Sequence, residues 1–256
     1  MPTDPAASGL PTDPAAARSD SHLRIVWVYP DLLSTYGDRG NLLILARRAQ
    51  ARGIDVETIP IAYDEPIPRS GDIYLVGGGE DRPQTLAAQR MRADGGLRAA
   101  VSAGAAVLAV CAGIQLIGEY FHIDGNRIAG AELLDLRSDR GESRAVGELV
   151  GEVDPRLGLP LLTGFENHGG RCHLGPAANP LAKVLVGTGN DGKTEGAWAG
   201  RVIGTYLHGP ALSRNPALAD LVLAWALDVP LMALPPIDDS WPEKLRAERL
   251  AAVLPR

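Results

Sequence analysis

Cysteine is scarce in this chain, whose 256 residues contain only two, Cys111 and Cys172. Two cysteines so far apart do not make the disulfide framework of a small secreted domain. Long hydrophobic runs are missing too, because no apolar stretch approaches the roughly 20 residues that span a bilayer. Residues 1–22 carry prolines and aspartates where the apolar part of a signal peptide would lie. These absences predict a cytoplasmic protein with reduced thiols.

A surplus of positive charge is also missing. The chain has 25 Lys and Arg residues against 31 Asp and Glu residues, which gives a formal net charge of −6. Proteins that bind nucleic acid neutralise its phosphates with clustered Lys and Arg, so this balance argues against a nucleic-acid partner. The hydrophobic content of 45% and the charged content of 22% are those of a globular protein.

The first 22 residues differ in composition from the rest of the chain. They contain the hexamer "PTDPAA" twice, at 2–7 and at 11–16. Such a Pro/Ala/Asp-rich segment cannot bury a core, so we expect a disordered tail at 1–22. No linker divides the rest of the chain, and residues 23–256 are predicted to be one domain with a C-terminal helical extension at about 231–256.

The segments after the tail alternate between strand and helix patterns. The first half predicts strands at 23–30, 55–61, 72–79 and 105–111, with helices at 41–53 and 83–102. The second half predicts strands at 146–153, 183–186 and 202–206, then helices at 216–227 and 241–253. This alternation predicts an α/β fold, with a mostly parallel sheet flanked by helices on both faces.

One cysteine occupies the junction between a predicted strand and a helix, in "LAVCAGIQLIGEYF" (108–121). Ligands of α/β proteins gather at the carboxyl ends of the strands. The small neighbours Ala109, Ala112 and Gly113 leave room for a sharp turn like the nucleophile elbow of hydrolases. A buried core cysteine would also fit here, so this stretch alone leaves packing and reactivity equally open for Cys111.

A reactive thiol needs a base, and His208 is the best placed of the five histidines. It ends a predicted strand in "VIGTYLHGP" (202–210), whereas His22 lies in the tail and His122 follows the helix after Cys111. Cysteine and histidine on separate strand ends of one sheet have the arrangement that nucleophilic acyl transfer requires.

Several motifs point to one family. "CAGIQ" (111–115) has the C-x-G-x-Q pattern of class I (triad) glutamine amidotransferases, and "LVGGGEDR" (75–82) resembles their glycine loop. "STYGDRGN" (34–41), "GFENHGGR" (164–171) and "GTYLHGP" (204–210) resemble the cobyric-acid-synthase-like branch. The resemblance is greatest to the GatD-type glutaminase subunits of lipid II isoglutaminyl synthases, and it implies a flavodoxin-like fold.

The resemblance also implies roles for individual residues. Cys111 would be the nucleophile that forms a γ-glutamyl thioester, and His208 the general base and then acid. The remaining implied roles are an oxyanion hole at Gly78, Gly79 and Ala112, substrate binding by Arg144 and Gln115, and a site border at His168.

One position departs from the family pattern. Typical members carry a glutamate two residues after the histidine, where this chain has Pro210. Another carboxylate of this chain or a partner subunit would have to orient His208, and we expect the partner. GatD-type proteins work with MurT, a Mur-ligase-like subunit, on which ATP and Mg would bind, with lipid II as the acceptor at the inner membrane face.

Two further patterns carry weaker alternatives. "GTGNDGKT" (187–194) matches the P-loop consensus, but the residues after it form a poor helix, so we expect a turn at Asn190-Asp191-Gly192 and no nucleotide site. His168, Cys172 and His173 do not have the spacing of a standard zinc site, and no metal is expected. Two other functions stay open: a glutaminase for another synthetase, such as a cobyric-acid-type enzyme, and a non-catalytic amidotransferase-like module.

Overall fold

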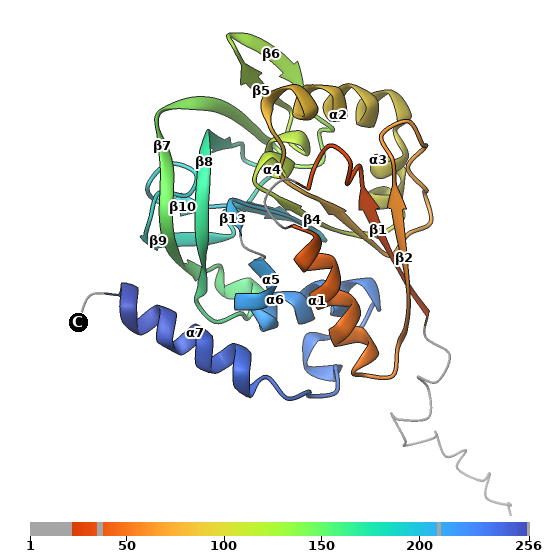
Figure 1. Ribbon diagram of the computed structural model, residues 1–256, viewed down its shortest axis with the longest axis vertical. Coiled ribbons are helices and arrows are strands. Elements are labelled where there is room, and N and C mark those ends of the chain that lie inside the picture. The colour runs from red at the N-terminus through yellow and green to blue at the C-terminus, as the bar shows by residue number, and fades with distance from the viewer. Residues whose placement is uncertain (1–21, 35–37, 209–210, 255–256) are drawn as a thin grey trace, which may run out of the picture.

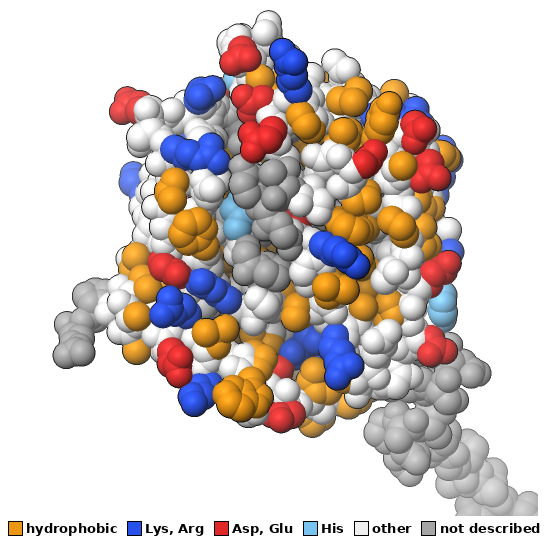
Figure 2. All heavy atoms as spheres, viewed as in Figure 1, with side chains coloured by type: hydrophobic (Ala, Val, Ile, Leu, Met, Phe, Trp, Pro, Cys, Tyr) orange, Lys and Arg blue, Asp and Glu red, His pale blue; other side chains and the backbone are white. Residues whose placement is uncertain are grey.

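The computed structural model describes residues 22–34, 38–208 and 211–254 (Figure 1). The predicted disordered tail lies outside these residues, apart from His22, which begins strand β1 (His22–Val28). Among the helices in these ranges, none combines the length and the apolar composition needed to cross a membrane. On the face seen in Figure 2, Lys and Arg side chains are scattered among Asp and Glu side chains.

A six-stranded sheet lies at the centre of the fold. Its strand order is β11-β12-β4-β3-β1-β2, and every neighbouring pair is parallel except β11 with β12. The strands besides β1 are β2 (Asp55–Ile61), β3 (Ile73–Val76), β4 (Ala106–Val110), β11 (Ala197–Ala199) and β12 (Val202–Thr205). The predicted α/β fold with a mostly parallel sheet is confirmed.

Each face of this sheet is covered by its own hydrophobic core. Successive side chains of a strand point to opposite faces, so Ile25 and Leu75 join one core while Tyr74 and Val107 join the other. Helices α1 (Arg39–Gln50) and α6 (Pro216–Ala226) pack in the first core, and helices α2 (Asp81–Asp94) and α3 (Gly96–Ser102) pack in the second. Figure 1 shows these two pairs on opposite sides of the sheet.

One long helix predicted at 83–102 is wrong, because two helices occupy this segment. Gly95 has a φ of +68° and separates α2 from α3. This left-handed conformation favours glycine and ends helices, and helical periodicity does not report it.

A second sheet, mostly antiparallel, was only partly predicted. Its main elements are the long strands β7 (Leu136–Val153) and β8 (Leu162–Leu174), of which the sequence predicted only 146–153. Charged residues and glycines interrupt both strands, and a register shift between Arg140 and Ala145 breaks the alternation. The other strands are β5 (Tyr120–Ile123), β6 (Asn126–Ala129), β9 (Ala182–Val186), β10 (Thr194–Glu195) and β13 (Leu207–His208).

The C-terminal extension is joined to the domain by ion pairs of a buried arginine. Helix α7 (Ser240–Val253) follows a short helical turn, η2 (Leu231–Ala233), close to the prediction for this segment. Just before α7, Asp239 accepts a 2.5 Å hydrogen bond from Arg48 Nη1, and Arg48 Nε donates to Asp220 of α6 at 2.8 Å. One arginine of α1 therefore joins the extension to the helices that cover the sheet.

Candidate active site

Cys111 lies in a sharp turn between β4 and helix α4 (Ala112–Leu116). Its φ of +53° and ψ of −114° are outside the regions that non-glycine residues usually adopt. The turn is held because the Cys111 N–H donates to the carbonyl of Thr205 at 2.8 Å. A Cβ at Gly113 would lie 2.4 Å from the Val76 carbonyl oxygen, so only glycine fits there. The predicted tight elbow is confirmed.

His208 reaches the same region from the neighbouring strand. It lies in β13, directly after β12, and β12 pairs with β4. Its backbone also pairs with Phe165 of β8, so the histidine belongs to the second sheet and not to the central one. The buried His208 side chain and Cys111 flank Gly78. A Cβ built on that glycine would lie 3.1 Å from Cys111 Cβ and 3.5 Å from His208 Cε1.

A carboxylate that sequence reasoning missed completes this cluster. Asp38, buried just before α1, has its Oδ1 atom 3.8 Å from His208 Nδ1, an ion-pair separation. Its Oδ2 atom accepts a 2.6 Å hydrogen bond from the Gly78 N–H. The family resemblance leads us to expect an acid from a partner subunit, but the structure places a carboxylate of the chain itself beside His208. The sequence signal for Asp38 is its position in the loop after β1, a strand that lies two places from β4 in the sheet. Loops at the carboxyl ends of such strands contribute to ligand sites.

The electrostatic environment of His208 favours its protonated form. Burial lowers the pKa of the imidazole, but Asp38 and then Cys111 raise it by more, to about 9. A negative carboxylate close to the ring stabilises the imidazolium and opposes the cost of removing it from water. An imidazolium beside a cysteine can support a thiolate and later protonate a leaving group.

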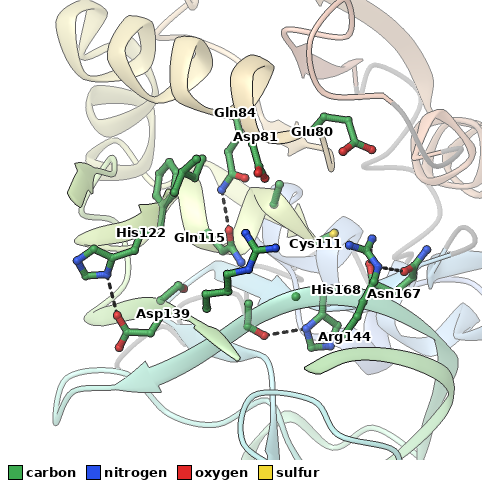
Figure 3. Close-up of a pocket in the computed structure, with 18 residues that line it drawn as sticks. Glu80, Asp81, Gln84, Cys111, Gln115, His122, Asp139, Arg144, Asn167 and His168 are labelled. Atoms are coloured by element: carbon green, nitrogen blue, oxygen red, sulfur yellow. Dashed lines mark hydrogen bonds and ion pairs between the residues drawn. The ribbon is translucent and has the colours of Figure 1, made fainter. Parts of the chain in front are cut away.

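A pocket of about 180 Å³ opens beside Cys111, large enough for a molecule several times the size of water. Figure 3 shows side chains from the glycine loop, α2, α4, β5, β7 and β8 converging on it. Its labelled lining residues are Glu80, Asp81, Gln84, Cys111, Gln115, His122, Asp139, Arg144, Asn167 and His168.

The residues expected to form an oxyanion hole fall into two groups. Gly79 and Ala112 line the pocket next to Cys111. Gly78 does not line it, and its N–H is already used by the Asp38 carboxylate. The structure thus leaves the amides of Gly79 and Ala112 as the candidates for an oxyanion, with Gly78 as the link to Asp38.

The residues expected to bind substrate line the same pocket. Arg144 donates from Nε to Asn167 Oδ1 at 2.6 Å, and Figure 3 shows the two side chains together at one end of the pocket. Gln115 accepts from Gln84 Nε2 at 2.7 Å and donates to the Tyr206 hydroxyl at 3.2 Å. The guanidinium of Arg144 and the hydrogen-bonded carboxamide of Gln115 therefore line the space beside Cys111.

His168 borders the pocket as expected, but its ring nitrogens face protein atoms. Nε2 lies 3.0 Å from Glu166 Oε2, and Nδ1 lies 2.9 Å from the Gly170 carbonyl oxygen. The Cys172 thiol lies 3.0 Å from Ser138 Oγ, and burial raises its pKa to about 11. Within the described residues no group of His, Cys, Asp and Glu has the arrangement of a metal site.

The segment that matches the P-loop consensus is a turn, as predicted. It joins β9 to the antiparallel β10, and Asn190 N–H donates to Thr194 O at 2.7 Å within it. The amides of Thr188 and Gly189 do bind an anion, at 2.6 and 2.8 Å, but this anion is the carboxylate of Glu166.

The comparisons with known proteins agree with this geometry. Residues 24–216 match the CobB/CobQ-like glutamine amidotransferase domain. The chain is 35% identical over 211 residues to the lipid II isoglutaminyl synthase (glutamine-hydrolyzing) subunit GatD of Staphylococcus aureus, across 80% of this chain and 85% of that protein. The subunit of the same name from Streptococcus pneumoniae is 33% identical over 214 residues, across 80% of each chain.

The fold has relatives among solved structures. The crystal structure of a glutamine amidotransferase superposes with a TM-score of 0.55 at 20% identity, over 78% of this chain and 98% of that one. At this identity the likeness shows a shared fold. With the family match covering most of the chain, it leads to one assignment: this chain belongs to the CobB/CobQ-like glutamine amidotransferases.

Proposed function

We propose that this chain hydrolyses L-glutamine at Cys111 and supplies the ammonia to an ATP-dependent ligase subunit. The observation that carries the proposal is the buried cluster of Cys111, His208 and Asp38 at the wall of a polar pocket. A cysteine in a strained elbow, an imidazole whose pKa is raised to about 9, and an ion-paired carboxylate are the parts of a nucleophilic triad.

In the first half-reaction the Cys111 thiolate attacks the side-chain amide carbon of glutamine. The negative charge that develops on the amide oxygen is stabilised by the N–H groups of Gly79 and Ala112. The imidazolium of His208 gives its proton to the amide nitrogen, which leaves as ammonia, and a γ-glutamyl thioester remains. Asp38 stabilises the imidazolium before this transfer and holds the ring in place afterwards.

In the second half-reaction the neutral His208 removes a proton from water. The resulting hydroxide attacks the thioester carbon, the Cys111 thiolate leaves, and glutamate is released with His208 protonated again. Arg144 suits the α-carboxylate of the bound glutamine, because a guanidinium forms paired hydrogen bonds with a carboxylate. Asp38 replaces the partner's acid that the sequence led us to expect.

The partner and the acceptor are inferred from the relatives. Both GatD proteins are named as subunits of lipid II isoglutaminyl synthases. We propose that residues 23–256 act as the amidotransferase domain with a MurT-type ligase subunit, which binds ATP and Mg. The ammonia would convert D-glutamate of lipid II to D-isoglutamine in peptidoglycan synthesis, at the cytoplasmic face of the membrane where the lipid substrate lies.

The test compares ammonia release from glutamine by the full chain, alone and with a co-expressed Mur-ligase-like subunit, for the wild type and for Cys111→Ala. Lys183→Gln is the control, because Lys183 is exposed on β9 and lies outside the pocket lining. We expect Cys111→Ala to abolish release and Lys183→Gln to leave it unchanged. Equal release from wild type and Cys111→Ala would mean a non-catalytic module.

A second measurement tests the acceptor. The purified complex is supplied with lipid II, ATP and glutamine, and the stem peptide is analysed by mass spectrometry. Amidation that depends on Cys111 supports the proposed acceptor. Glutamine hydrolysis without lipid II amidation, by a chain that binds no Mur-ligase-like subunit, would indicate a glutaminase for another synthetase.

A further inference from the structure

A second carboxylate–imidazole pair lies beside the catalytic cluster. Glu166 and His168 are both buried on β8, with 3.0 Å between Oε2 and Nε2. The Glu166 carboxylate also accepts hydrogen bonds from the backbone N–H groups of Thr188 and Gly189. Burial raises the pKa of Glu166, but His168 and these amides lower it by more. The pair is therefore an ionised carboxylate held from three sides and an imidazole held by that carboxylate.

The orientation of the His168 ring is fixed at both nitrogens. One faces Glu166 and the other faces the Gly170 carbonyl oxygen at 2.9 Å, so rotation of the ring would break both contacts. The ring stacks on Tyr206, with 3.6 Å between centroids and 8° between planes. A ring that cannot rotate presents a fixed flat surface to the tyrosine.

Tyr206 connects the His168 ring to the pocket through its hydroxyl group. Its hydroxyl accepts the hydrogen bond from Gln115 Nε2 at 3.2 Å, and it lies 3.2 Å from the Cys172 thiol. Gln115 in turn accepts from Gln84, and both glutamines line the pocket. A Cβ at Gly170 would lie 2.0 Å from Gln115 Nε2 and 2.8 Å from the Tyr206 hydroxyl, which shows how closely β8 approaches this contact.

We propose that His168, held by Glu166, is a positioning residue for the glutamine pocket. It fixes the Tyr206 ring, and the Tyr206 hydroxyl fixes the direction in which Gln115 presents its carboxamide to the substrate. This inference rests on the proposed glutaminase function and adds a role that neither Cys111 nor His208 performs. The P-loop-like turn has a place in the same arrangement, because its amides hold the Glu166 carboxylate.

The first experiment is a double-mutant cycle on glutamine hydrolysis with His168→Gln and Tyr206→Phe, measured in the complex. Each change should raise KM about fivefold and leave kcat within about twofold, the effect of losing one oriented hydrogen bond of about 1 kcal/mol. Since His168 acts through the Tyr206 hydroxyl, the double variant should match Tyr206→Phe alone. Tyr206→Phe removes only an oxygen, so it tests the proposal even if His168→Gln folds poorly.

Two kinetic outcomes would overturn the proposal. One is a double variant in which the fold increase in KM equals the product of the increases in the two single variants, because the two residues would then act independently. The other is a fall in kcat with KM unchanged, because the pair would then act on the chemistry and not on the pocket. Lys183→Gln serves again as the control, since it alters an exposed residue of the second sheet that lies outside the pocket lining.

A labelling experiment separates this inference from the proposed function. Alkylation of Cys111 by a diazoketone analogue of glutamine requires the pocket, whereas alkylation by iodoacetamide requires only the thiol. We expect His168→Gln to raise the analogue concentration that gives the half-maximal labelling rate by about fivefold, as for KM. The rate of labelling by iodoacetamide should be unchanged. Equal slowing of both reagents would overturn positioning of the pocket. A wild-type chain that is labelled by the analogue but never releases ammonia would instead overturn the proposed function.

Discussion

Replacing Asp38 by asparagine is the most direct test of the triad. Asparagine keeps the shape of the side chain and an oxygen that can accept the Gly78 N–H, so the glycine loop stays in place. It removes the negative charge 3.8 Å from His208 Nδ1. The expected result is a folded protein whose His208 has lost the main cause of its raised pKa.

The size of the effect can be worked out from the structure. The rise of the His208 pKa from 6.5 to about 9 corresponds to a preference of about 3 kcal/mol for the imidazolium. A hydrogen bond to Asp38 is the first of the causes that raise this pKa, and we assign Asp38 about 2 kcal/mol. This lies below the roughly 4 kcal/mol of two unit charges about 4 Å apart at an effective dielectric constant of about 20. In kcat/KM it amounts to about thirtyfold.

The assay is kcat/KM for glutamine as a function of pH, from about pH 6 to about pH 10. A raised pKa keeps His208 protonated below about 9, so wild-type activity should be lost as the pH rises through that value. In Asp38→Asn this alkaline limb should move to lower pH by about 1.5 units, the equivalent of about 2 kcal/mol. An alkaline limb at the wild-type position, with activity within about threefold, would refute the role of Asp38.

Three further predictions concern other residues. Arg144→Gln should raise KM for glutamine by about thirtyfold with a smaller effect on kcat, since charge-assisted hydrogen bonds contribute about 2 kcal/mol, whereas Arg137→Gln on the same strand should leave KM unchanged. Burial raises the pKa of Glu195 from 4.5 to about 7. The free energy of unfolding of the wild type should therefore fall by about 3 kcal/mol as the pH rises from 4.5 through 7. Urea unfolding of Glu195→Gln should show no such fall. Gly113→Ala, whose Cβ would meet a backbone oxygen of β3 at 2.4 Å, should lower both stability, by about 3 kcal/mol, and glutamine hydrolysis. Its control Gly125→Ala, in open space with a φ of +78°, should lower stability by about 1 kcal/mol and leave hydrolysis unchanged.

Local pattern was enough to predict the strands β4 and β12, which lead to Cys111 and His208. Each follows an apolar strand and has small residues beside it, and both signals lie within a few positions of the residue. Asp38 gives no such signal, since its role arises when the sheet brings the loop after β1 to the loops after β3 and β4. The contact with His208 joins residues far apart in the sequence, and only the order of the strands reveals it.

The second sheet was harder to predict for a different reason. β7 carries charged residues and glycines along its length, and a register shift after Arg140 moves the alternation out of phase. Its stability comes from pairing with β8, a contact that intrinsic propensity does not report. The pocket residues Arg144 and His168 belong to these two strands, and the family resemblance located them although the strand pattern did not.

The strained backbone of Cys111 has a consequence for how this protein can evolve. A non-glycine residue at a φ of +53° and a ψ of −114° costs roughly 1–3 kcal/mol, and glycine would remove much of that strain. Glycine at this position would therefore relieve strain and abolish the nucleophile in one step. In a lineage that no longer needs to hydrolyse glutamine, Cys111→Gly would be tolerated. The same mutation would remove the catalytic activity and relieve backbone strain in the folded state.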